Sequence, residues 1–271
     1  MSRSSLFQMR VRRPRGILVQ MFGLMFEEKW KQNQGIPFVM THLKKYVEQN
    51  LEDVDLLHTI HSLRISSRSL GLHDETVPVI LDDNHPVSSE IIDSVYSFYS
   101  WLRSMGRGSH ELRYFEDLVI SDGLKNDLIK VSVYEDVFPA FSDWKKEGIK
   151  IFIDCPHLKL SDVKLFLMKT TAGDLSPLLD GVFGNEQEFM TRDAKESYKR
   201  VLDKISIPVP DLLYITHFGQ KAKFMAEVMS MSSLIVDRDE NRKVRSYYMI
   251  RFPTVKDLRE ITFVEKPKKK K

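Results

Sequence analysis

The sequence predicts an α/β fold in which a parallel sheet is interrupted by an all-helical insertion. A short apolar run at residues 16–20, which follows a basic stretch with a Pro, is typical of a buried first strand. From the mid-thirties to the low 120s the apolar residues recur at helical spacing. Beyond residue 136 helical and strand-like segments alternate, a pattern typical of a parallel sheet with helices on both faces.

Composition indicates a folded protein with no membrane span. The chain has 271 residues, of which 42% are hydrophobic and 29% charged, enough for one large core and a smaller domain. A single Cys excludes an intrachain disulfide and fits a reducing compartment. No apolar stretch approaches the length of a transmembrane helix. We therefore expect a cytoplasmic monomer without a membrane partner, and the nucleus stays open as a second location.

Basic residues gather at both ends of the chain, although the net charge is only +3. We expect residues 1–15 to be a disordered basic leader and residues 263–271 a lysine-rich tail, because runs of like charge are most often solvated ends. Other roles stay open: a transit peptide for the leader, and a nuclear import signal or a nucleic-acid or lipid patch for the tail. Between them we expect a core at 16–34 and 124–262 and a helical cap at 35–123.

The insertion shows four helical patterns. The first has Leu43, Tyr46, Val47 and Leu51 on one face, and the second has Leu56, Ile60 and Leu63 on one face and ends at Gly71. A third begins at an expected N-cap at Ser88–Glu90 and runs to Met105, and a fourth runs from Leu112 toward Gly123. The sequence therefore predicts a cap made of helices.

The remainder of the chain shows the helix and strand alternation of the core. We predict helices at 137–148, 161–168, 195–205 and 220–229, and strands at 149–154, 178–183, 212–216 and 234–236. In such a sheet, ligands bind at the carboxyl ends of the strands. The candidate site is therefore expected near Gln20, Asp154–His157 and His217.

Several segments, in order, are similar to the enolase-phosphatases (acireductone synthases), a family of the haloacid dehalogenase-like superfamily. They are Val95–Trp101, Asp136–Ala140, Gly173–Phe183, Glu196–Tyr198 and Tyr214–Thr216, and the resemblance runs from about Gly16 to about Leu258. It implies a Rossmannoid core with an inserted cap. It also implies Mg²⁺-dependent hydrolysis of 2,3-diketo-5-methylthiopentyl-1-phosphate in methionine salvage.

The resemblance also implies which residues stand at the catalytic positions of the family. Its nucleophilic Asp falls on Gln20, its acid/base Glu on Phe22 and its metal-binding Asp on His217. An amide cannot attack phosphorus to form an acyl phosphate, and a phenyl ring cannot transfer a proton. We therefore expect no catalytic residue and no metal ligand at these positions.

The phosphate-binding positions differ as well. The Ser-Ser-Gly loop of the family falls on Cys155, Pro156 and His157, and Pro156 lacks the N–H that such a loop directs at a phosphate. The phosphate-binding Lys falls on Arg192, which keeps the positive charge. In the cap, the Asp-Arg-Lys loop becomes Gly106–Gly108. Arg192 is thus the one substrate-binding residue that we expect to remain.

The sequence leaves more than one function open. The first hypothesis is a pseudophosphatase with a binding or regulatory role, without a cofactor, acting through a protein partner or a weakly bound anionic metabolite. The alternative is an active acireductone synthase that uses Mg²⁺. A further hypothesis is a new zinc or Cys–His site formed by Cys155, His157 and His217 with Asp154. We expect no nucleic-acid partner apart from contacts of the lysine tail.

Overall fold

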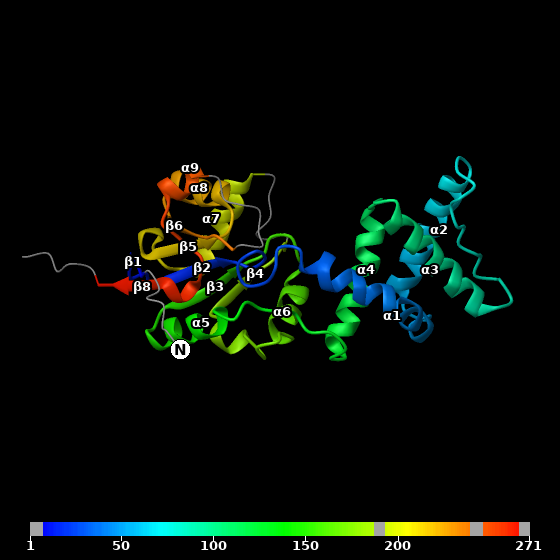
Figure 1. The fold of residues 1–271 in the computed structure, drawn as a ribbon, viewed down its shortest axis with the longest axis horizontal. Coiled ribbons are helices and arrows are strands. Elements are labelled where there is room, and N and C mark those ends of the chain that lie inside the picture. Colours follow the sequence, from blue (N-terminus) through cyan, green and yellow to red (C-terminus); the bar gives the residue numbers. More distant parts are fainter. Residues whose placement is uncertain (1–7, 187–192, 239–245, 266–271) are drawn as a thin grey trace, which may run out of the picture. The chain divides into compact units, whose positions relative to one another are not determined.

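The computed structural model describes residues 8–186, 193–238 and 246–265. The chain divides into two compact units (Figure 1). The first, here called the core, comprises residues 1–29 and 130–271, and the second, the cap, comprises residues 30–129. The sequence predicts a cap at residues 35–123, and the structural unit extends a few residues further at each end.

The core is built on a six-stranded parallel sheet of order β4-β3-β2-β5-β6-β7. Its strands are β2 (Gly16–Gln20), β3 (Lys150–Asp154), β4 (Gly181–Phe183), β5 (Leu212–Thr216), β6 (Ser232–Val236) and β7 (Thr254–Val255). Ile17, Leu18 and Val19 of β2 are fully buried, as expected of a strand with neighbours on both edges and layers on both faces. The predicted parallel α/β fold is confirmed.

Helices cover both faces of this sheet (Figure 1). They are α5 (Val137–Lys146), α6 (Leu160–Met168), α7 (Ala194–Ile205), α8 (Gly219–Glu227) and α9 (Ser246–Arg251), with short 3-10 turns at Ser176–Leu178, Val209–Asp211 and Leu258–Glu260. Apolar side chains from α7 and α8, among them Val201 and Met225, pack against Leu18 and Tyr214 of the sheet. This packing fixes the strand ends at which the candidate site is expected.

Residues 9–12 correct the expectation of a disordered leader. Met9–Arg12 form strand β1, which pairs in parallel with β8 (Ile261–Val264) in a separate two-stranded sheet. Strand β8 also enters the segment that was expected to be a lysine-rich tail. Partly buried residues alternate with exposed arginines along β1, which is the period of a half-buried strand. The basic composition masked this pattern because the charges lie on the exposed side.

The cap is all-helical, as the sequence predicts. It contains a π-helical turn at Lys31–Gly35 and the helices α1 (Ile36–Gln49), α2 (Val54–Gly71), α3 (Ser88–Ser104) and α4 (His110–Lys125). Two details differ from expectation. Leu51 lies beyond the end of α1 and is exposed, and the N-cap of α3 is Val87, which has no capping side chain. Nowhere in the described ranges is a helix long and apolar enough to cross a membrane.

Candidate functional site

The carboxyl ends of β2, β3 and β5 bring the expected site residues of the core together. These strands are neighbours in the sheet, and Gln20 is paired in register with Asp154. Thr216 ends β5 and His217 follows it directly. Three of the residues singled out from the sequence, Gln20, Asp154 and His217, therefore stand at one end of the sheet.

Gln20 is engaged by a neighbouring strand. Its side-chain Oε1 accepts a hydrogen bond from the Thr216 hydroxyl, and the same hydroxyl oxygen accepts from the backbone N–H of Phe218 at 2.9 Å. This arrangement joins the end of β2 to the turn after β5. Gln20 contributes a neutral amide whose oxygen already has a donor, so it offers neither charge nor nucleophilicity at the site.

Phe22 belongs to an aromatic cluster. Its ring meets the edge of Phe166 with centroids 5.9 Å apart and lies 6.1 Å from Phe26. Aromatic pairs at such distances stabilise a fold through packing and ring electrostatics. The side chain therefore fills space with apolar surface in the loop after β2.

His217 packs tightly on the loop after β2. Gly23 has φ +78°, and a Cβ atom there would overlap the His217 ring. The ring is buried, and its Nδ1 has no hydrogen-bond partner in the part of the chain that the structure describes. Burial lowers the pKa of His217, and Glu28, with Oε1 3.9 Å from Nε2, only partly opposes this by favouring the charged form. We infer that His217 is neutral at pH 7.

Asp154 is the buried carboxylate of the site, and it accepts hydrogen bonds from two tyrosines. The hydroxyl of Tyr198, on α7, donates to Oδ2 at 2.6 Å, and that of Tyr214, on β5, donates to the same oxygen at 2.8 Å. Burial and the adjacent carboxylate raise the pKa of both tyrosines well above the usual value. Both rings therefore stay protonated and keep donating to Asp154.

The loop after β3 holds the remaining expected residues. Cys155 is buried, and burial with the charge of Asp154 raises the pKa of its thiol to about 12. Pro156 has no N–H to give, and His157 is exposed. Arg192 lies outside the described residues. Within 8–186, 193–238 and 246–265, no three His, Cys, Asp or Glu side chains are placed to hold a metal ion, so Cys155, His157 and His217 do not form the hypothesised zinc site there.

A buried ion pair ties the loops at this end of the sheet together. Arg238, just beyond β6, forms a bidentate pair with Asp136 at 2.8 and 2.9 Å. It also donates to the backbone oxygen of Leu24 at 2.9 Å, while Asp136 accepts from the N–H of Leu258 at 2.6 Å. Sequence patterns predict neither this ion pair nor the two tyrosines at Asp154, because the partners are far apart along the chain.

Comparison with solved structures defines the class of fold. The UTR4 protein of Saccharomyces cerevisiae superposes with a TM-score of 0.65 at 15% identity, covering 91% of this chain and 99% of the yeast chain. The putative HAD-hydrolase YfnB of Bacillus subtilis, solved bound to magnesium, gives a TM-score of 0.51 at 12% identity and covers 92% and 97%. The chain thus has the haloacid dehalogenase fold, as predicted.

Comparison of sequences narrows the resemblance within that class. The chain is 25% identical over 234 residues to Enolase-phosphatase E1 of Anopheles gambiae, covering 86% of this chain and 77% of the relative. No protein-family model matches the chain. The similarity to the enolase-phosphatases that the sequence motifs predict is confirmed.

Proposed function

We propose that this chain is an enolase-phosphatase-like protein that does not turn over phosphate esters and acts by binding. The observation that carries the proposal is the end of β2, where Gln20 is hydrogen-bonded to Thr216 and Phe22 is packed against Phe166. In the enolase-phosphatases the nucleophile at this position is a carboxylate, and neither an amide nor a phenyl ring can replace it. Residues 10–26 contain no Asp or Glu, so no neighbour along the strand can take that role.

The donor groups at this end of the sheet also suit Mg²⁺ poorly. Mg²⁺ prefers charged oxygen ligands in near-octahedral geometry and gives up its water reluctantly. Gln20 is neutral, His217 offers a nitrogen, and the Asp154 carboxylate already accepts two tyrosine hydroxyls. The proposal therefore includes no resident metal at this site.

The alternative function is an active acireductone synthase, and the sequence similarity over 234 residues favours it. It would hydrolyse 2,3-diketo-5-methylthiopentyl-1-phosphate with Mg²⁺. Such activity would require a nucleophile other than the residue at the end of β2. Cys155, which follows β3 directly, is a nucleophilic residue type near this position. A pKa of about 12 keeps its side chain in the thiol form at neutral pH.

A phosphatase assay separates the two functions. Purified protein is incubated with Mg²⁺ and either a generic aryl phosphate or the acireductone-type phosphate, and released phosphate is measured. We expect no Mg²⁺-dependent turnover and no rise in melting temperature with Mg²⁺. Mg²⁺-stimulated release of phosphate would establish the alternative, and its persistence in Cys155→Ala would show that Cys155 is not the nucleophile.

Variants that restore the catalytic residue types of the enolase-phosphatases serve as matched controls. Gln20→Asp alone should stay inactive, because residues that act as a catalytic unit are strongly non-additive. The triple variant Gln20→Asp, Phe22→Glu, His217→Asp should recover a trace of activity if the scaffold is intact. Turnover by the single variant would show that more of the site remains than we propose.

We expect the ligand to be a protein partner or a weakly bound anionic metabolite, and Arg192 is the residue that we expect to contact the metabolite. For phosphate itself we expect a dissociation constant no tighter than about 1 mM, equivalent to about 4 kcal/mol. Calorimetric titration with phosphate measures this directly. Micromolar affinity that is lost in Arg192→Ala would indicate a retained metabolite site and contradict the expectation of weak binding.

A further inference from the structure

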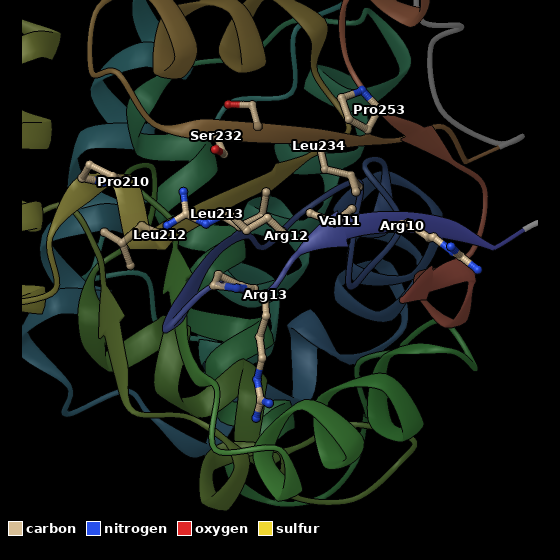
Figure 2. A pocket seen from close by; sticks show the side chains of 12 residues that line it. Arg10, Val11, Arg12, Arg13, Pro210, Leu212, Leu213, Ser232, Leu234 and Pro253 are labelled. Carbon is tan, nitrogen blue, oxygen red and sulfur yellow. The ribbon is translucent and has the colours of Figure 1, made fainter. Parts of the chain in front are cut away.

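Figure 2 shows the residues that line a hollow of about 310 Å³ in the core. Leu212 and Leu213 at the start of β5 and Ser232–Leu234 at the start of β6 line it. Residues 10–14, from β1 and the turn after it, form another wall. The hollow therefore lies at the amino-terminal ends of β5 and β6 and is separate from Gln20 and His217.

The charged residues that line the hollow are all basic. They are Arg10, Arg12 and Arg13, and the described lining residues include no Asp or Glu. Arg12 pairs with Asp211 at 3.1 Å and Arg13 with Glu265 at 2.6 Å. Arg10 is exposed and has no ion pair within the described part of the chain. The hollow therefore presents positive charge that is only partly neutralised.

Among the described residues, strand β1 has one edge without a strand partner beside this charge. The N–H of Arg13 donates to the oxygen of Val264 at 2.9 Å, and β1 pairs with β8 alone among the described strands. Peptide groups alternate in direction along a strand, so those of Arg10 and Arg12 point away from β8. An exposed edge of this kind is a template for a further strand.

The hollow also has an apolar part. Figure 2 shows Val11 and Leu234 directed toward one another, while Arg10 extends away at the end of β1. Val11 is partly buried and Arg10 and Arg12 are exposed, so the two faces of β1 differ in chemistry. A strand added beside β1 would present alternate side chains to the apolar part and to the arginines.

We propose that the free edge of β1 and the hollow bind an extended acidic segment of a partner protein by strand addition. Main-chain hydrogen bonds to Arg10 and Arg12 supply affinity, and alternating acidic and aliphatic side chains supply specificity. Acidic chemistry is favoured over basic because three arginines line the hollow. The inference does not depend on the loss of phosphatase activity, since the two sites lie at opposite ends of the sheet.

The test is fluorescence polarisation with the full chain and a labelled seven-residue peptide of alternating Glu and Val. The peptide should bind saturably, and Arg10→Glu should weaken it about tenfold because a like charge then faces the peptide. Lys164→Glu is the matched control, since this exposed residue on α6 makes the same charge change away from the hollow. The control should bind like the unmodified chain.

Amide hydrogen exchange then locates the peptide. Exchange of the Arg10 and Arg12 amides should slow in the complex, whereas that of Arg13, already bonded to Val264, should change little. The inference is overturned by unchanged exchange at Arg10 and Arg12, by the absence of saturable binding, or by equal binding in Arg10→Glu. A peptide with Lys in place of Glu that binds equally well, or a single-stranded oligonucleotide that binds more tightly, would also overturn it.

Discussion

The two ends of the core sheet differ in whether their polar groups are paired with one another. At the carboxyl ends of β2, β3 and β5, Gln20 is bonded to Thr216, and Asp154 accepts from Tyr198 and Tyr214. At the amino ends of β5 and β6, Arg10 has no ion pair in the described chain and β1 keeps an unpaired edge.

This difference indicates where ligand binding is favourable. Polar groups that already satisfy one another contribute to stability, and a ligand would have to displace those bonds. Groups that face water lose little when a partner replaces the water. We therefore expect substitutions at the carboxyl end to change the free energy of unfolding, and substitutions at the amino end to change binding.

The largest effect is expected at the Asp136–Arg238 pair. Asp136→Ala leaves the guanidinium of Arg238 buried without its carboxylate, which should cost about 3–5 kcal/mol in the free energy of unfolding measured with urea. Arg259→Ala is the control, because its pair with Asp257 is far more exposed and should contribute about 1 kcal/mol or less. Equal losses of unfolding free energy in the two variants would contradict the conclusion that the buried Asp136–Arg238 pair stabilises the fold.

The next effect tests how closely His217 packs on the loop after β2. Gly23→Ala should lower the free energy of unfolding by about 3 kcal/mol, because the added Cβ combines a positive φ with overlap on the His217 ring. Gly148→Ala is matched in backbone, with φ +76°, and its Cβ would meet no atom of the described residues within 4 Å, so it should lower the free energy of unfolding by about 1 kcal/mol.

A double variant separates the two contributions. In a His217→Ala background the ring is gone, and Gly23→Ala should then cost about as much as Gly148→Ala. Urea denaturation of the four variants completes the cycle. A cost for Gly23→Ala that is independent of the ring would show that backbone conformation alone decides this position.

A smaller loss is expected when the tyrosines lose their acceptor. Asp154→Ala leaves the hydroxyls of Tyr198 and Tyr214 without their partner and should cost about 2–3 kcal/mol. Arg10→Ala at the other end of the sheet should change stability by no more than about 0.5 kcal/mol. If Arg10→Ala proved the more destabilising, the contrast between the two ends would fail.

The smallest effect is a dependence on pH. The pKa of His217 is lowered in the folded protein, so below the ordinary pKa of histidine the unfolded chain binds a proton that the folded chain does not. The free energy of unfolding should therefore fall as pH decreases from 7 to 5, and fall less in His217→Gln. Glu28→Gln should deepen the acid loss, because Glu28 favours the charged ring. Identical pH profiles for the unmodified chain and His217→Gln would refute this.

The sequence alone determined the parallel α/β core, the helical cap and the end of the sheet at which Gln20, Asp154 and His217 meet. These follow from apolar periodicity and from the rule that parallel strands end together, both of which are local or topological properties. Strand β1 is not predicted from the sequence, because its partner β8 lies some 250 residues further along the chain and its arginines resemble a solvated leader.

Only the tertiary structure decided what each site residue does. Asp154 looked like a metal ligand from its residue type, yet its partners are tyrosines 44 and 60 residues away. The free edge of β1 and the pairing of Arg238 with Asp136, 102 residues away, became visible in the same way. The physical reason is that periodicity identifies which side chains are buried, whereas the partner of a buried polar group depends on which distant segments the packed core brings within hydrogen-bonding distance.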